Sequence, residues 1–193
     1  MTADEYDTFD EETGWDRRDF LRLSAAGLVA AALFDPMEAL AAAQRPVRQL
    51  AFLNTHTGER IKAEYWVKGR YQKDALKAIN RVMRDHRTGS VHKMDPRLLD
   101  LMFTMQSRLG NKGPFHLVSA YRSPQTNAAM HESDPSGVAR RSFHVQGKAV
   151  DIRLPNQSLS NLYKVALRMR AGGVGYYPES NFVHVDVGPV RRW

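Results

Sequence analysis

The sequence predicts an α+β fold in which helices flank an antiparallel β-sheet. Residues 44–193 contain segments with apolar side chains at helical spacing and short β-branched or aromatic runs, which are typical of helices and strands. The two kinds of segment do not alternate regularly, as they do in parallel-sheet folds, and this favours an antiparallel sheet. The length of 193 residues fits one domain, predicted at 44–193, behind a leading segment at 1–43.

A hairpin and a helix are predicted first. Residues 49–54 and 60–68 are rich in β-branched and aromatic side chains and flank the turn sequence Thr57-Gly58-Glu59, so they predict two paired strands. Apolar side chains recur at helical spacing in residues 71–87, which predicts a helix with one buried face.

A helix, a strand and another helix follow. Asp95-Pro96 is a strong helix start, because aspartate caps free N–H groups and proline fits the first helical position. That helix is expected to end near Gly110. Residues 115–120 predict a short strand, and Ser123-Pro124 opens a helix that is expected to reach about residue 132.

The last part of the chain predicts a strand, a helix and a strand. Residues 149–154 are apolar enough for a strand around Asp151. Helical spacing continues through residues 159–170 and stops at Gly172-Gly173. Residues 182–187 alternate apolar and polar side chains, as a strand with two different faces does.

The composition limits the chemistry of the chain. Cysteine is absent, which excludes disulfides, thiolate nucleophiles and cysteine-based zinc sites and leaves histidine and carboxylates as possible metal ligands. Residues 1–43 carry a net charge of −7, and residues 44–193 carry +14. A body this basic favours a polyanionic partner such as nucleic acid, anionic lipid or an acidic cell-wall polymer.

Residues 1–43 are predicted to be an export signal. Residues 16–22 (DRRDFLR) resemble the twin-arginine signal, and the uncharged stretch 24–34 would span only about 16 Å as a helix, too short to cross a bilayer. Small residues at 39–41 and 41–43 offer two cleavage sites. The signal predicts transport by the twin-arginine machinery and a mature form without a stable membrane span. The alternative is a short alanine-rich core helix.

Two histidines lie near carboxylates in patterns that suggest a metal site. His144 precedes Asp151 by seven residues with a turn at Gly147 between them, and His184 and Asp186 face the same side of a predicted strand. Burying such pairs is costly unless they are hydrogen-bonded or hold a metal. His144, Asp151 and His184 would leave one tetrahedral position open, the pattern of a catalytic zinc site. The alternative is two separate His–Asp hydrogen bonds.

Several segments match motifs of a known family. One set comprises SAYRSP at 119–124 with Asn127, SFHVQGKAVD at 142–151 and FVHVD at 182–186. This set resembles the zinc D-Ala-D-Ala peptidases, which share a fold and metal site with the hedgehog signalling domain and the lysostaphin-type enzymes. A second set comprises NTHTGE at 54–59, RD at 84–85, MDPRLL at 94–99, GGVGYYP at 172–178 and GPVR-x-W at 188–193. It is similar to the YcbK-like branch of murein peptidases, and the resemblance runs from about residue 48 to residue 193.

The resemblance implies a zinc ion held by His144, Asp151 and His184 and activity on peptidoglycan stem peptides. It also implies that Arg122 contacts the substrate and stabilises charge on the scissile carbonyl, which a planar guanidinium can do. The alternative for Arg122 is a surface salt bridge. The same motifs imply substrate contacts from Tyr121 and from Ser142; Ser142 could instead orient the first ligand or be a plain turn residue.

One position departs from the family pattern. Many relatives carry a glutamate or aspartate as general base three residues before the last histidine, where this chain has Asn181. Asp186 is expected to replace it, because it shares a strand face with His184 and lies about 7 Å along from it. Glu179, on a loop, is the second candidate. Asp186 could equally fix the tautomer of His184.

The expected function is that of an exported, periplasmic zinc peptidase, a murein endopeptidase that acts on cross-links. The basic body fits an anionic wall, whereas scattered basic residues and export argue against nucleic acid as a partner. Two alternatives stay open: a non-catalytic, zinc-stabilised peptidoglycan-binding module, which Asn181 favours, and a carboxypeptidase that releases D-Ala.

Overall fold

The computed structural model describes residues 47–111, 113–134 and 138–193. The predicted export signal at 1–43 lies outside these residues and stays a prediction. Across the described ranges, none of the helices has the length and apolar character needed to cross a membrane.

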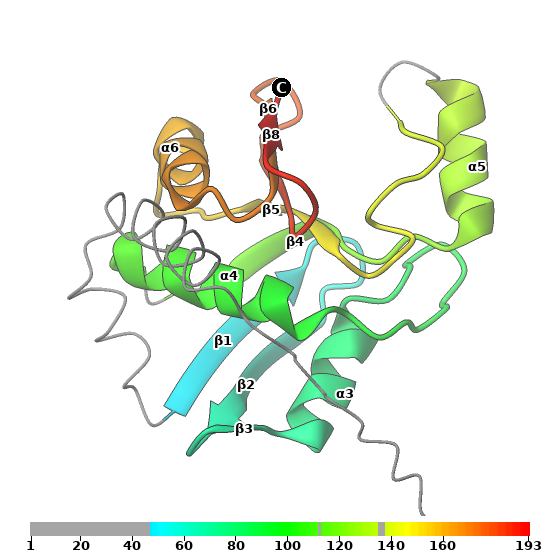
Figure 1. Cartoon of the computed structure of the whole chain (residues 1–193). Coiled ribbons are helices and arrows are strands. Elements are labelled where there is room, and N and C mark those ends of the chain that lie inside the picture. Colours follow the sequence, from blue (N-terminus) through cyan, green and yellow to red (C-terminus); the bar gives the residue numbers. More distant parts are fainter. Residues whose placement is uncertain (1–46, 112, 135–137) are drawn as a thin grey trace, which may run out of the picture. The chain divides into compact units, whose positions relative to one another are not determined.

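The α+β class is confirmed, but the sheet is mixed. The elements in chain order are β1 (Val47–Asn54), β2 (Arg60–Val67), β3 (Arg70–Tyr71), α3 (Lys73–Val82), α4 (Pro96–Arg108), β4 (Phe115–Ser119), α5 (Pro124–Ser133), β5 (Ala149–Arg153), α6 (Leu159–Met169), β6 (Gly173–Tyr177), β7 (Phe182–Asp186) and β8 (Arg191–Arg192). The strands form one eight-stranded sheet in the order β3-β2-β1-β4-β5-β7-β6-β8 (Figure 1).

Two strand pairs are parallel, so the prediction of an antiparallel sheet was wrong in part. β1 pairs with β4 in parallel, and the long connection through α3 and α4 gives the chain room to return in the same direction. β6 pairs with β7 on one side and with β8 on the other. After β7 the chain crosses to the far side of β6, and β8 therefore runs parallel to β6. The remaining pairs are antiparallel, including the predicted hairpin β1–β2.

The predicted helix starts are confirmed by their caps. The Asp95 side chain accepts a hydrogen bond from the Arg97 N–H, and the Ser123 side chain accepts one from the Thr126 N–H, so each satisfies a free donor at a helix start. The predicted helix at 71–87 is shorter than expected. Tyr71 belongs to β3, and after Val82 the chain leaves the helix for a turn around Asp85.

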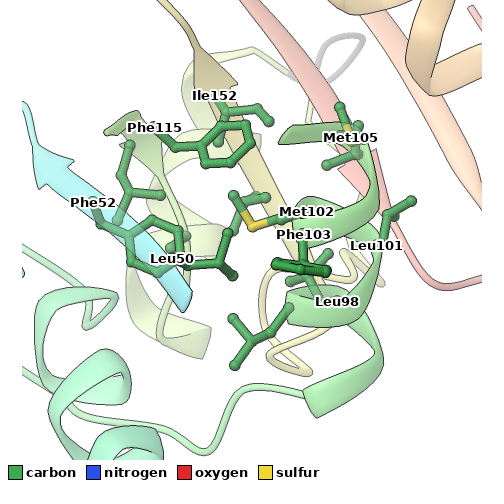
Figure 2. Packing of buried hydrophobic residues seen from close by; sticks show 14 of the residues in the cluster. Leu50, Phe52, Leu98, Leu101, Met102, Phe103, Met105, Phe115 and Ile152 are labelled. Carbon is green, nitrogen blue, oxygen red and sulfur yellow. The ribbon is translucent and has the colours of Figure 1, made fainter. Parts of the chain in front are cut away.

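The apolar core leaves one side of the central strands for polar groups. Figure 2 shows Met102 of α4 among the side chains of Phe52 and Phe115, which come from β1 and β4. Val150 and Ile152 of β5 belong to this core, and the intervening Asp151 points to the other side of the sheet. In Figure 1, α6 and α5 stand on opposite sides of the strands β5 to β8.

Candidate metal centre

The structure brings the three predicted ligands together. Asp151 of β5 and His184 of β7 are cross-strand partners, and His144 comes from the loop before β5. The Oδ1 of Asp151 lies 2.8 Å from the Nδ1 of His184 and 3.2 Å from the Nε2 of His144. The two ring nitrogens are 3.2 Å apart, and all three side chains are buried.

The outer nitrogen of each histidine has an acceptor, which fixes the ring tautomer. The Nδ1 of His144 lies 2.6 Å from the carbonyl oxygen of Ala120, so it carries the proton and donates. The Nε2 of His184 lies 3.0 Å from the Oδ2 of Asp186 and donates to that carboxylate. In its neutral form, each histidine therefore turns an unprotonated nitrogen toward Asp151, as metal-binding histidines with such partners do.

The spacing and chemistry of these atoms fit a zinc ion. Ligands at about 2.0–2.1 Å from tetrahedral zinc lie about 3.3 Å from one another. The three separations are 2.8 Å, 3.2 Å and 3.2 Å, close to that value. Two imidazoles and one carboxylate are a common ligand set of catalytic zinc, in which the fourth position stays open.

Burial and charge favour the metal-binding protonation state at two of the three groups. Burial lowers the pKa of His144 below its ordinary value more than neighbouring Asp151 raises it. Burial would raise the pKa of Asp151, but His144 and His184 outweigh it and lower this pKa well below the ordinary value. A neutral His144 and an ionised Asp151 are both ready to donate a lone pair near neutral pH. At the third group, burial would lower the pKa of His184, but the carboxylates of Asp151 and Asp186 outweigh it and raise this pKa above the ordinary value, so a metal ion would have to displace a proton there.

Arg122 lies beside the candidate metal centre. Its Nη2 donates to the Oδ2 of Asp151 at 2.6 Å, and its Nε donates to the Oγ of Ser119 at 2.9 Å. Ser142 lies in the same cleft, and its hydroxyl accepts a hydrogen bond from the backbone N–H of His144 at 3.3 Å. The contact is with the backbone of His144 and not with its ring, and the role of Ser142 stays a prediction.

The candidate metal centre opens into a cleft of about 540 Å³. The cleft is lined by Arg122, Met130, Asp134, Val138, Ala139, Arg141, Ser142, Phe143, His144, Asp151, Tyr177, Ser180, Phe182, His184, Arg191 and Trp193. One wall comes from α5 and the loop before β5, and the other comes from the turn between β6 and β7 and from Arg191 and Trp193.

Two residues predicted for the site do not line this cleft. Tyr121 turns its ring against His92, with ring centroids 4.6 Å apart, and its backbone N–H donates to Met83. Glu179 is exposed in the turn between β6 and β7, outside the lining of the cleft. Asn181 follows in the same turn and lines a different hollow, together with His116.

Asp186 lies behind His184, on the side away from the Oδ1 of Asp151. It is fully buried and accepts hydrogen bonds from the N–H groups of Gly173 and Gly188 and from the guanidinium of Arg191. Burial would raise its pKa, but these donors and His184 outweigh it and hold the pKa below the ordinary value. A carboxylate so fully hydrogen-bonded is a poor proton acceptor, and this geometry favours the role of orienting His184.

Asp85 supports the segment next to the site, and the sequence motifs included it without a role. Its Oδ2 accepts the backbone N–H of Ser123 at 2.8 Å, and its Oδ1 accepts those of Arg87 and Thr88. Asp85 thus ties the turn after α3 to the residue next to Arg122. Its sequence signal was only the Arg84-Asp85 pair, because the partner lies 38 positions away.

Replacing Asp85 by asparagine is expected to destabilise the protein by about 2 kcal/mol at pH 7, since hydrogen bonds to a charged acceptor are lost. Burial would raise the pKa of Asp85, but the hydroxyls of Thr126 and Ser123 and the nearby N–H groups lower it below 3.8. The stabilisation is therefore complete above pH 3.8 and is lost as the pH falls through the folded-state pKa.

Urea unfolding at pH 7 and at pH 3 checks this prediction. The gap between wild type and Asp85→Asn should be smaller at pH 3 than at pH 7. Asp74→Asn, at an exposed position on α3, is the matched control and should change the free energy of unfolding by less than about 0.5 kcal/mol at either pH. An equal gap at both pH values would contradict the assignment of the stabilisation to an ionised Asp85.

Comparisons with known proteins place the chain in a family. Residues 41–193 match the M15 peptidase family model described as "Peptidoglycan L,D-endopeptidase MepK". The chain is 44% identical over 177 residues to the Escherichia coli K12 protein of that name, covering 92% of this chain and 96% of the relative. It is 40% identical over 178 residues to a probable peptidoglycan L,D-endopeptidase MepK of Haemophilus influenzae, with shares of 92% and 95%.

Both relatives align with nearly their whole length, and the family model spans residues 41–193, a range that includes all the elements that build the site. Peptidases of the M15 family are metallopeptidases, and the chain has a His-Asp-His group that could hold a metal ion. The chain belongs to the peptidoglycan L,D-endopeptidase MepK family of M15 peptidases.

Proposed function

We propose that this protein is a zinc-dependent peptidoglycan endopeptidase that hydrolyses L,D-peptide bonds in cross-links of the cell wall. The observation that carries the proposal is the convergence of His144, Asp151 and His184 at the floor of a cleft. The names of the relatives supply the substrate, since these are called peptidoglycan L,D-endopeptidases.

Zinc and Arg122 would have different roles in the hydrolysis. Zinc, when bound, polarises the scissile carbonyl and makes a water molecule nucleophilic near neutral pH. Arg122 supplies a fixed positive charge at the place where negative charge develops on the carbonyl oxygen. Its Nε bond to Ser119 and its ion pair with Asp151 hold the guanidinium in place before substrate arrives, which is the requirement for electrostatic stabilisation.

We propose that Asp186 positions His184 and does not act as the general base. Replacing Asp186 by asparagine should then weaken zinc binding roughly 10- to 100-fold, the usual cost of losing the hydrogen-bond partner of a ligand. Activity should return when zinc is added in excess, because the reacting groups are intact. The measurement is activity against free zinc concentration, at fixed substrate.

A general base would give a different result. Loss of a base would leave the zinc affinity unchanged and keep kcat low at saturating zinc. Because Asp186 is buried, Arg191→Lys serves as a milder second variant. Lysine keeps the positive charge but cannot make the two hydrogen bonds that the Arg191 guanidinium donates to the Oδ2 and Oδ1 of Asp186, at 2.6 Å and 3.2 Å. We expect a smaller loss of zinc affinity from it, again with kcat restored by zinc.

The proposed place of action is the periplasm, reached through the twin-arginine pathway. The DRRDFLR sequence at 16–22 and the short uncharged stretch after it support export. The net charge of +14 on residues 44–193 supports docking on an anionic wall, an attraction that should weaken as salt rises.

Whole sacculi separate the proposal from its two alternatives. The zinc-loaded protein should release cross-linked material as soluble fragments with new peptide ends. A binding module would be retained on the sacculi and release nothing, and a carboxypeptidase would release free alanine without loosening cross-links. Arg122→Ala and a zinc-chelated sample are the controls for a wall-bound but inactive protein.

A further inference from the structure

Trp193 presents an aromatic surface next to the metal centre. The residue is 48% exposed, and it is the aromatic one among the large hydrophobic residues that the described ranges leave exposed. It lines the cleft, and its ring centroid lies 5.2 Å from that of His184. Single exposed hydrophobic residues are common on proteins, so exposure alone assigns no role.

Several contacts hold Trp193 in place despite its exposure. Its Nε1 donates to the hydroxyl of Tyr177 at 2.7 Å, and the guanidinium of Arg191 lies 5.0 Å from the ring. The backbone N–H donates to Val174 and the carbonyl accepts from Tyr176, which continues the parallel pairing of β8 with β6. A side chain fixed in advance loses little conformational entropy when a ligand packs on it.

Gly175 makes room for this indole. A Cβ atom at Gly175 would lie 2.7 Å from the indole Nε1 and Cε2. The backbone of Gly175 is not left-handed, so its missing side chain, and not its conformation, is what the structure requires. Gly175 is also the cross-strand partner of His184, and this register places the indole beside a metal ligand.

The surroundings of Trp193 define the chemistry that it can contact. Tyr177 and Phe182 stack on each other with centroids 4.5 Å apart, and both line the same wall of the cleft. The guanidinium of Arg191 is occupied by Asp186, so this wall offers aromatic surface and a paired charge. Such a wall suits an uncharged, aliphatic part of a ligand.

We propose that Trp193 is a substrate-positioning platform on which an aliphatic part of the stem peptide packs beside the scissile bond. The inference rests on the proposed function and adds a residue and a contact to it. This platform would explain the GGVGYYP and GPVR-x-W segments together. The first segment supplies Gly175, which makes room for the indole, and the Tyr177 hydroxyl, which accepts its hydrogen bond; the second supplies the indole.

Steady-state kinetics on a cross-linked muropeptide dimer test the platform with the purified full chain. Trp193→Ala should raise KM roughly tenfold, the effect of losing a buried aromatic contact, and leave kcat within about twofold. Gly175→Ala should raise KM similarly although the tryptophan is still present, because the added Cβ would displace the indole. Tyr177→Phe should have a smaller effect, and it covers the case in which the larger changes impair folding.

The matched control is Trp66→Phe. Trp66 lies on β2 against Tyr71 and Arg48 and does not line the cleft, so its replacement should leave KM unchanged. Zinc content should stay the same in every variant. A normal KM in Trp193→Ala, or a loss of zinc that explains its defect, would overturn the platform.

A fluorescence titration separates failure of the platform from failure of the proposed function. The full chain has three tryptophans, at positions 15, 66 and 193, so the signal lost in Trp193→Phe belongs to Trp193. An uncross-linked stem peptide should change that signal even if the wild type hydrolyses nothing, which would refute only the proposed function. Hydrolysis by the wild type without any change in the Trp193 signal would refute only the platform.

Discussion

His144→Ala is expected to remove both the metal and the activity. The side chain is buried, and its Nε2 lies 3.2 Å from each of the other two ligand atoms, so its loss leaves two of the three ligands. We expect kcat/KM on a cross-linked dimer to fall at least roughly a thousandfold, which corresponds to about 4 kcal/mol in the barrier. Zinc content by mass spectrometry should fall from one equivalent to near zero in the same sample.

His116→Ala is the matched control for this variant. His116 lies on β4 and lines a separate hollow with Arg153, so its loss should change neither zinc content nor activity. A His144→Ala protein that keeps one zinc and normal turnover would show that the ligand set is wrong. If the zinc stayed but the turnover vanished, His144 would have a different role from the one assigned.

Arg122→Ala is expected to lower kcat roughly 10²- to 10³-fold, the usual cost of losing one preorganised group that stabilises a developing oxyanion. The variant also leaves the Oδ2 of Asp151 without its partner at 2.6 Å, so zinc should be present in excess during the assay. Under that condition the remaining loss reports on the transition state. Steady-state kinetics at saturating zinc give kcat and KM separately.

Arg122→Lys sharpens the test. Lysine keeps the charge but cannot bind Ser119 and Asp151 at the same time with a planar fork, so we expect it to recover only part of kcat. Arg70→Ala, at an exposed position on β3, controls for the loss of one positive charge from a basic protein. If Arg122→Ala raised KM alone, the guanidinium would bind substrate without stabilising the transition state.

Local sequence patterns predicted most of the helices and strands. The features that depend on pairing between distant segments were not predicted. Asp95-Pro96 fixed a helix start because the cap and the proline act within one turn. The sequence did not predict β6, because Gly173 and Gly175 are typical of a turn. In the structure, Gly175 leaves room for the indole of Trp193. The parallel pairing of β1 with β4 depends on a crossover through two helices, which no local pattern encodes.

The site was predictable where its residues share a strand or a motif. Two-residue periodicity correctly placed His184 and Asp186 on one face of β7, but it could not tell which ring nitrogen each neighbour takes. The partner of His144 is a backbone carbonyl, at Ala120, for which a sequence has no signal. Adjacent residues also diverged: Arg122 faces the metal centre, and Tyr121 turns to His92.

The central claim is that one zinc ion in the His144, Asp151 and His184 site hydrolyses cross-links. The most direct test is to titrate zinc into the metal-free protein and follow hydrolysis of a dimeric muropeptide with a defined L,D cross-link. Activity should rise from zero and level off at one zinc per chain, and the product masses should be those of two monomers. Full hydrolysis without zinc, or none at any zinc concentration, would contradict the claim.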